Sequence, residues 1–327
     1  MAVLGAGRIG LLHARNALGL AEGVALRVVA DPSEEALEHA RSAGADTARD
    51  WQEAVRRSDV DAVLVASPTR FHREQVLAAA EAGKHVFCEK PIDRDPDVID
   101  ELIEACEQAG VSLQTGFNRR FDRNFAALRE RVRDGEVGRV WSLRITSRDP
   151  EPPPLDYLKG SGGLFADMAI HDFDMARFIT GQEIVEVGVF ADALISEHTS
   201  EADDVDVAFT SLRFEDGTLG VIENARACTY GYDQRVEVHG ERGTVFAGNE
   251  SRDTVWLGDS SGFHREPLLD FFLDRYSAAY VRELESFASA CREGEPVEVT
   301  GWDGRQAVVA AAAADRSLRE GRSVTLG

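Results

Sequence analysis

Asp167 and His171 are the two side chains whose types and spacing most directly suggest proton transfer. They lie four residues apart in a segment with helical periodicity, 164–179, so both are expected on one face of a helix. A neutral imidazole can accept a hydroxyl proton, and a neighbouring carboxylate can orient the ring or support its charge. The same spacing also fits a surface pair on a helix, or a metal site with Asp174, although such a site would lack a second histidine at ligand spacing.

A lysine is the next side chain for which a role in substrate binding or proton transfer is expected. Lys90 follows the apolar run 85–88 and precedes Pro91, and it is one of only three lysines in the chain. Because proline has no N–H to give to a sheet, Pro91 is expected to end the strand and leave Lys90 at its carboxyl edge. A cation at that edge can hold a substrate hydroxyl and lower the pKa of its proton.

The chain opens with a G-x-G-x-x-G pattern between a strand-like run and a helix-like run. A strand, a tight glycine turn and a helix in this order predict a dinucleotide-binding loop, with the pyrophosphate at the helix N-terminus. Asp31 ends the second apolar run, where a carboxylate bonds the ribose 2′-hydroxyl of NAD and repels the 2′-phosphate of NADP. The alternative is a simple turn, with Asp31 capping a helix that begins near Ser33. The expected cofactor-binding residues of the loop are Gly5, Gly7, Arg8, Ile9 and Gly10.

Further cofactor contacts are expected after the strand-like runs 62–66 and 85–88. Residues at the carboxyl ends of strands line the binding crevice of such sheets, so Ser67 and Thr69 are expected to contact the ribose or the nicotinamide. His72 is expected to begin the next helix, in a packing rather than a catalytic role, and we place it in the cofactor group. Glu89 and Lys90 are assigned to the same edge.

The elements that must position these side chains alternate between strand and helix in the first third of the chain. This alternation predicts a parallel, doubly wound sheet. The opening strand is unusually short, as expected if a few residues are absent upstream of Met1. The expected strands are 2–4, 26–30, 62–66, 85–88 and 111–115, and the expected helices include 9–18, 33–43 and 97–109.

The pattern changes after residue 117. Alternating runs with turn signals over 205–247 predict an antiparallel meander. We therefore expect two domains: a Rossmann α/β domain, 1–117, and an α+β domain, 118–327, with an open antiparallel sheet and flanking helices. The other elements expected in the second domain are a strand over 138–147 and helices over 121–133, 164–179, 276–292 and 302–319.

The composition excludes several classes of protein. With 36 basic and 58 acidic residues the formal net charge is −22, which argues against nucleic acids and anionic membranes as partners. No apolar run reaches the ~18 residues of a membrane span, and no secretory signal follows Met1, so the cytoplasm is expected. The four cysteines are scattered without a C-x-x-C pair, so neither a zinc cage nor a disulfide framework is predicted.

Three motifs together resemble the glucose–fructose oxidoreductase and inositol dehydrogenase superfamily: the glycine turn, Glu89-Lys90-Pro91 and Asp167-x-x-x-His171. The resemblance extends over nearly the whole chain. Four further stretches are similar to bacterial inositol 2-dehydrogenases, which oxidise myo-inositol to a 2-keto inosose with NAD. These stretches are 116–122, 170–174, 230–233 and 302–304.

The resemblance implies roles for individual residues. Lys90 would act in proton relay and substrate binding, and Asp167 and His171 would complete a catalytic trio with His171 as the general base. The cofactor would be NAD. The usual assembly would be a homo-oligomer, a tetramer or dimer formed through the exposed face of the second domain's sheet. The residues implied at or near a polyol pocket, besides the trio, are Asn118, Arg119, Asp149, Asp172, Tyr230 and Tyr232.

Three alternatives remain open from the sequence. The first is the same chemistry on scyllo-inositol, another sugar such as a pyranose, or an anhydrosugar. The second is an NAD-dependent glycosidase, in which a bound nicotinamide is recycled and no net NADH forms. The third is a catalytically silent NAD-binding regulator, which would be expected to lack at least one of Lys90, Asp167 and His171, and all three are present.

Overall fold

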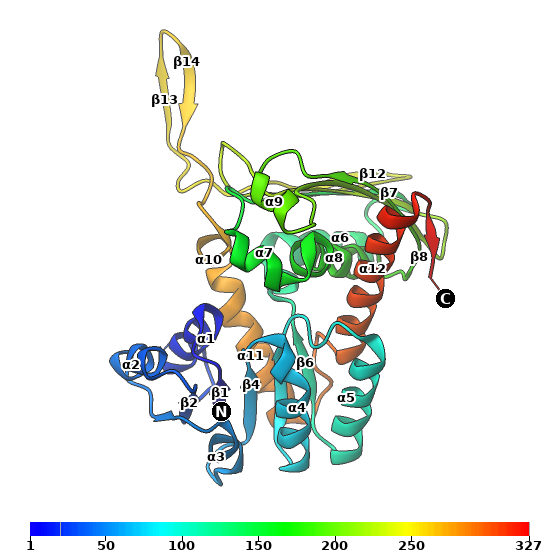
Figure 1. Ribbon diagram of the computed structural model, residues 1–327. Helices are drawn as coiled ribbons and strands as arrows, with labels where there is room; N and C mark the ends of the chain where they lie inside the picture. The colour runs from blue at the N-terminus through cyan, green and yellow to red at the C-terminus, as the bar shows by residue number, and fades with distance from the viewer. Residues whose placement is uncertain (20, 327) are drawn as a thin grey trace. The chain divides into compact units, whose positions relative to one another are not determined.

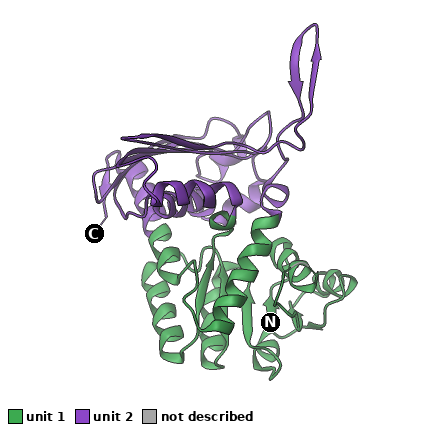
Figure 2. Cartoon of the chain, turned by 180° about the vertical axis from the view of Figure 1, so that it is seen from behind, with its two compact units in different colours: residues 1–121, 278–308 green, residues 122–277, 309–327 purple. Residues whose placement is uncertain are grey.

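The computed structural model describes residues 1–19 and 21–326, and the chain divides into two compact units (Figure 2). Unit 1 consists of Met1–Phe121 and Ala278–Val308, and unit 2 consists of Asp122–Ser277 and Val309–Gly327. In the described part of the chain, every helix is too short or too polar to cross a membrane.

Unit 1 is built on a six-stranded sheet with the strand order β3-β2-β1-β4-β5-β6 (Figure 1). All neighbouring strands are parallel, which confirms the doubly wound sheet predicted from the alternation of elements. The strands are β1 (Ala2–Leu4), β2 (Val28–Ala30), β3 (Thr47–Ala48), β4 (Ala62–Val65), β5 (His85–Glu89) and β6 (Leu113–Gly116). The helices between them are α1 (Arg8–Gly19), α2 (Glu34–Ser42), α3 (Trp51–Arg56), α4 (His72–Glu81) and α5 (Pro96–Ala109), with short 3-10 turns η1 (Thr69–Phe71) and η2 (Asn118–Phe121).

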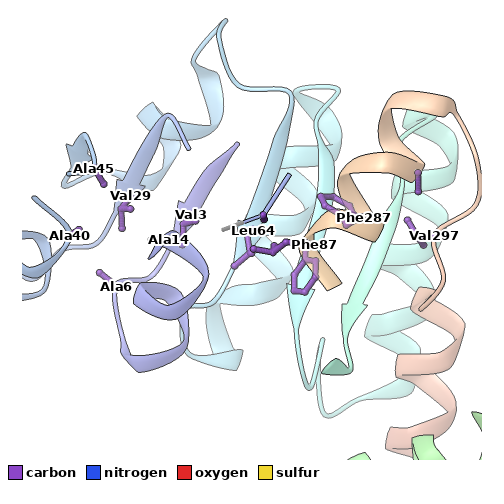
Figure 3. Close-up of a cluster of buried hydrophobic side chains, with 13 residues drawn as sticks. Val3, Ala6, Ala14, Val29, Ala40, Ala45, Leu64, Phe87, Phe287 and Val297 are labelled. Atoms are coloured by element: carbon purple, nitrogen blue, oxygen red, sulfur yellow. The ribbon is translucent and has the colours of Figure 1, made fainter. Parts of the chain in front are cut away.

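The core of unit 1 forms because its central strands are apolar along most of their length. Val3, Leu64 and Phe87, on the adjacent strands β1, β4 and β5, are fully buried (Figure 3). Burial of such a side chain contributes about 1.5–3 kcal/mol. This packing fixes the carboxyl ends of the strands, where the candidate cofactor residues lie.

A segment from near the end of the chain completes this core. Helix α11 (Ser277–Glu293) places Phe287 edge-on against Phe87, with ring centroids 5.7 Å apart (Figure 3). The segment Ala278–Val308 therefore belongs to the same compact unit as the stretch 1–117, for which the sequence pattern predicted a Rossmann domain. The division between the units falls inside the long helix α12 (Gly301–Glu320).

Unit 2 contains a seven-stranded sheet with the order β12-β11-β7-β10-β9-β8-β15. The sheet is mixed rather than wholly antiparallel, because β7 and β10 pair in parallel while the other neighbours are antiparallel. The strands are β7 (Val140–Arg148), β8 (Ile184–Asp192), β9 (Val207–Phe214), β10 (Leu219–Ala225), β11 (Asp233–Gly240), β12 (Gly243–Ala247) and β15 (Val324–Thr325).

Helices cover one face of this sheet and leave the other open. α6 (Arg123–Arg133) and α8 (Ile170–Thr180) pack against each other on the same side of the sheet (Figure 1). Along β9 the burial alternates, with Ala208 and Leu212 buried and Phe209 half exposed. Unit 2 also contains the short helices α7 (Leu155–Ser161), α9 (Glu197–Glu201) and α10 (Phe272–Arg275), and a projecting hairpin of β13 (Trp256–Asp259) and β14 (Gly262–Arg265) (Figure 1).

Candidate active site

The glycine loop after β1 is packed so closely that side chains are excluded from two of its positions. Gly5 has a φ of +97°, and a Cβ on it would lie 2.7 Å from the carbonyl oxygen of Ala66. A Cβ on Gly10 would lie 1.9 Å from the carbonyl oxygen of Gly5. At Gly7, in contrast, a Cβ would meet no described atom within 4 Å. The first turn of α1 therefore begins beside open space, and Arg8 at its start is exposed.

Asp31 is fixed to the glycine loop by hydrogen bonds. One oxygen of its carboxylate accepts the backbone N–H of Ala6 at 2.7 Å, and the other accepts the N–H of Ser33 at 2.8 Å. The side chain that caps α2 is that of Ser33, whose Oγ accepts the N–H of Ala36. Asp31 is therefore not the helix cap that the alternative interpretation assumed. Its charge lies at the end of β2, directly beside the loop.

Ser67 and Thr69 lie after β4 and are both partly exposed. The Ser67 hydroxyl donates to Gln75 of α4 at 2.7 Å. His72 is 1% exposed, and its Nε2 lies 2.7 Å from the carbonyl oxygen of Ser67. Burial lowers the pKa of His72. These contacts give His72 the packing role expected from the sequence, and its assignment as a cofactor contact stays a prediction.

Lys90 lies at the carboxyl end of β5, in the turn that the sequence predicted. It is partly exposed, and the peptide bond that joins it to Pro91 is cis. Its backbone N–H donates to the Glu89 carboxylate at 3.2 Å. Because the carboxyl ends of parallel strands meet at one edge of a sheet, this turn lies on the same edge as Gly5 and Asp31.

Asp167 and His171 lie in unit 2, at the junction of two kinds of helix. Asp167 is in the π-helical segment η3 (Phe165–Ala169), and His171 is in the first turn of α8. Both side chains are partly exposed. π-Helical turns are rare and frequently occur at functional sites. In the described residues, no group of three His, Cys, Asp or Glu side chains forms a metal site around this pair or elsewhere.

Two residues that the sequence did not single out hold Asp167 in place. The Tyr157 hydroxyl donates to one carboxylate oxygen at 2.9 Å, and Nη1 of Arg226 lies 3.5 Å from the other. Arg226 is 1% exposed and also lies 3.4 Å from Asp204. The buried Arg226 guanidinium and the Tyr157 hydroxyl together fix the position of the Asp167 carboxylate. No motif marks either residue: Tyr157 lies ten positions before Asp167, in α7, and Arg226 lies 59 positions after it.

The other predicted substrate residues of unit 2 have different surroundings. Asp172 is fully buried and accepts a hydrogen bond from Asn224 at 2.8 Å. Tyr230 is half exposed, and its hydroxyl donates to Asp233 at 2.7 Å. Burial, together with this carboxylate, raises the pKa of Tyr230 to about 12.

Tyr232 is 4% exposed and packs edge-on against Phe271 and Tyr276. Tyr230 is therefore the more accessible of the two tyrosines that the sequence grouped together. Asp149 follows β7, is partly exposed, and has its backbone N–H bonded to Ala225.

Asn118 and Arg119 belong to unit 1, in the turn η2 after β6. They are 2% and 6% exposed, respectively. The next residue, Arg120, forms an ion pair with Asp303 at 2.9 Å, which ties this turn to α12. The predicted substrate residues are thus divided between the units: Asn118 and Arg119 with Lys90 in unit 1, and the others in unit 2.

A doubly wound domain with a loop of this kind binds dinucleotides at the carboxyl edge of its sheet. Ionisable side chains suited to proton transfer occur on both units, and hydride transfer to a nicotinamide needs such groups. The fold and these side chains together define a class of protein, the dinucleotide-dependent oxidoreductases.

Comparisons with known proteins identify the family. Residues 1–117 match the model of the oxidoreductase family with an NAD-binding Rossmann fold, and residues 125–246 match the GFO/IDH/MocA C-terminal domain. The chain belongs to the GFO/IDH/MocA family of oxidoreductases, and its cofactor is NAD.

Curated relatives extend over almost the whole chain. The chain is 48% identical to a myo-inositol 2-dehydrogenase of Thermotoga maritima, over 99% of this chain and 97% of that protein. It is 42% identical to an inositol 2-dehydrogenase of Rhizobium meliloti, over 99% and 98%. A scyllo-inositol 2-dehydrogenase (NAD(+)) of Bacillus subtilis is 35% identical, over 99% and 95%.

Solved structures agree with this assignment. A probable dehydrogenase from Thermotoga maritima superposes with a TM-score of 0.97 at 48% identity, covering 99% of this chain and 98% of that one. The scyllo-inositol dehydrogenase of Lactobacillus casei, solved with NAD(H) and scyllo-inositol, superposes with a TM-score of 0.93 at 28% identity, over 99% and 98%.

Proposed function

We propose that this protein is an inositol 2-dehydrogenase that oxidises a ring hydroxyl of myo-inositol to the ketone, 2-keto-myo-inositol, with NAD. The observation that carries the proposal is full-length similarity, at 48% and 42% identity, to two inositol 2-dehydrogenases. The presence of Lys90, Asp167 and His171 supports it, because a polyol oxidation needs a group to hold the hydroxyl and a base to take its proton.

The residues of unit 1 fit NAD. The absence of a side chain lets Gly5 pack against the backbone of Ala66, and lets Gly10 pack against the backbone of Gly5. Gly7 leaves the space that a pyrophosphate needs beside the first turn of α1. Asp31 presents a carboxylate to the ribose hydroxyls. The other residues assigned to the cofactor lie at the carboxyl ends of the strands or in the elements that follow them: Arg8 and Ile9 begin α1, Ser67 and Thr69 follow β4, and Glu89 ends β5. Bound NAD supplies the hydride acceptor for the substrate carbon.

In the proposed mechanism, three ionisable side chains together remove the proton of the reacting substrate hydroxyl. His171 accepts the hydroxyl proton as the general base, and Asp167, held by Tyr157 and Arg226, supports the positive charge that forms on the imidazole. Lys90 binds the reacting hydroxyl and lowers the pKa of its proton. Asn118, Arg119, Asp149, Asp172, Tyr230 and Tyr232 are assigned to the polyol pocket or its walls.

The proposal is tested by following NADH absorbance with myo-inositol, scyllo-inositol and aldoses, with NAD and NADP in parallel. We expect NAD-linked turnover that is fastest with myo-inositol. Faster turnover with scyllo-inositol would favour that isomer, consistent with the B. subtilis relative. No net NADH with any of these, together with cleavage of a glycoside by protein that retains NAD, would replace the proposal with the glycosidase reaction.

We also propose that the protein is a homo-oligomer, a dimer or tetramer assembled through the open face of the unit 2 sheet. Phe190 and Phe209 are directly paired across β8 and β9, and they are 86% and 50% exposed. Trp141, Leu219 and Phe246 are large exposed side chains on other strands of the sheet, and apolar surface of this extent marks interfaces. In light scattering, Phe190→Asp should reduce the particle mass, and an unchanged mass would exclude this face.

For the location in the cell we propose the cytoplasm. All four cysteines are free thiols, three of them buried, as is typical of a reducing compartment. Fractionation of cells that express the tagged protein tests this, and recovery outside the cytoplasmic fraction would contradict it.

A further inference from the structure

A completely buried histidine on α1 contacts the last residue of the strand that precedes Lys90. His13 is 0% exposed, and its Nε2 lies 2.7 Å from Oε1 of Glu89, the last residue of β5. His13 stands in the helix that begins at the glycine loop. Its ring meets Phe87 and Tyr280 edge-on, at centroid distances of 5.3 Å and 5.6 Å. The function proposed above assigns no role to His13.

The surroundings of the His13 ring indicate which of its two nitrogens carries the proton. Nδ1 of His13 is buried and has no hydrogen-bond partner among the residues that the structure describes. A proton on Nδ1 would therefore be a buried donor without an acceptor, which is costly. The favoured tautomer carries its proton on Nε2 and donates it to the Glu89 carboxylate, so the contact is a charge-assisted hydrogen bond inside the unit 1 core.

The other oxygen of Glu89 reaches the turn that holds the catalytic lysine. Oε2 accepts the backbone N–H of Lys90 at 3.2 Å. A Cβ on Gly116, the last residue of β6, would lie 2.9 Å from the same oxygen, so β6 closes around the carboxylate. Glu89 is thus held between α1 and β6 while it bonds the backbone of Lys90.

A second buried histidine fixes the far side of the same turn. Nδ1 of His72 lies 3.0 Å from the carbonyl oxygen of Pro91, and its Nε2 lies 2.7 Å from that of Ser67. The turn is therefore tied to α1 through Glu89 before Lys90, and to α4 through His72 after it. Only the first connection runs to the helix that begins at the cofactor loop.

We propose that His13 and Glu89 form a positioning pair, which sets the backbone of Lys90 relative to α1 and thereby to the NAD loop. Neither side chain needs to touch the substrate, since the pair acts through the Lys90 backbone. The inference rests on the role proposed for Lys90. Displacing a catalytic group by about 1 Å can cost up to about 100-fold in rate, so a modest loosening of this turn is expected to lower kcat by about tenfold.

Three variants test the pair. His13→Leu removes the donor, and His13→Gln keeps an N–H that can donate to Glu89. The matched control is His85→Leu: His85 lies at the opposite end of β5, is partly buried, and bonds Ser112 of the neighbouring segment. We expect His13→Leu to lower kcat by about tenfold with little change in the Kd for NADH, His13→Gln to recover most of the rate, and His85→Leu to leave kcat near wild type.

Lysine labelling provides a readout that needs no substrate. Because the chain has only three lysines, trace acylation followed by mass spectrometry resolves Lys90 from Lys84 and Lys159. In His13→Leu we expect Lys90 to be labelled faster relative to the other two, with wild-type ratios in His13→Gln and His85→Leu. An unchanged Lys90 ratio in folded His13→Leu would overturn the proposal. Absence of polyol turnover in the wild type would refute the proposed function and leave the labelling result to decide on the pair.

Discussion

Substitutions of Asp31 are expected to change two separately measurable quantities: the free energy of unfolding and the preference for NAD over NADP. Its two oxygens accept the N–H groups of Ala6 and Ser33. Ala6 is 3% exposed, so in Asp31→Ala its N–H loses its acceptor, which costs about 1–3 kcal/mol of unfolding free energy. Ser33 is exposed, and water replaces its lost bond. Asp31→Asn keeps one acceptor oxygen and should cost less.

The selectivity effect follows from charge. Two unit charges about 4 Å apart in water-like surroundings interact by about 1 kcal/mol, and a phosphate carries about −1.5 to −2. The Asp31 carboxylate is then worth about 1.5–2 kcal/mol against NADP, which is roughly 10- to 30-fold in kcat/KM. Both Asp31→Ala and Asp31→Asn should lower the NAD-over-NADP ratio by about this factor.

Steady-state kinetics with each cofactor, alongside urea unfolding, measures both quantities. Ser33→Ala is the matched control, because it removes the α2 cap, at a cost of about 1 kcal/mol, and leaves the carboxylate in place. A ratio that stays at the wild-type value in both Asp31 variants would refute the electrostatic reasoning and leave Asp31 only as an anchor of the glycine loop.

Three other predictions address catalysis, titration and packing. Lys90→Ala and His171→Ala should each lower kcat by about 100-fold or more while calorimetry shows NAD binding largely intact, whereas near-wild-type turnover would remove the assigned role. The pKa of Tyr230 is raised from 10.0 to about 12, so its contribution to stability is present below pH 10 and is lost as the pH rises toward 12. Comparing the pH dependence of unfolding in wild type and Tyr230→Phe should show a shallower loss in the variant over that range, and superimposable curves would contradict the raised pKa. Phe287→Ala should destabilise the protein by about 3–5 kcal/mol in urea unfolding, and a loss below 1 kcal/mol would mean that the end of the chain is dispensable to the core of unit 1.

The first unit was predictable from sequence because its signals are local. The runs around Val3, Leu64 and Phe87 are apolar and bounded by turns, as strands buried on both faces must be. At the glycine loop and at the Lys90–Pro91 turn, the residue types themselves determine the local backbone conformation. The return of α11 to this unit has no such signal, because the contact of Phe287 with Phe87 joins residues 200 positions apart.

In the second unit, several features could not be predicted from local sequence patterns. The turns of the meander were evident, but the parallel pairing of β7 with β10 depends on residues far apart in the chain. The i,i+4 spacing of Asp167 and His171 predicted a regular helix, and the structure instead has a π-helical segment at Asp167. The partners Tyr157 and Arg226 could not be identified, because neither a hydrogen bond from the preceding helix nor an ion pair with a distant residue leaves a periodic pattern in the sequence.

Formation of NADH from NAD and myo-inositol by the purified protein tests the central claim most directly. The account predicts steady turnover that requires both compounds, is much weaker with NADP, and is lost in His171→Ala. Folded protein that binds NAD and yields no NADH with myo-inositol at any concentration would contradict it.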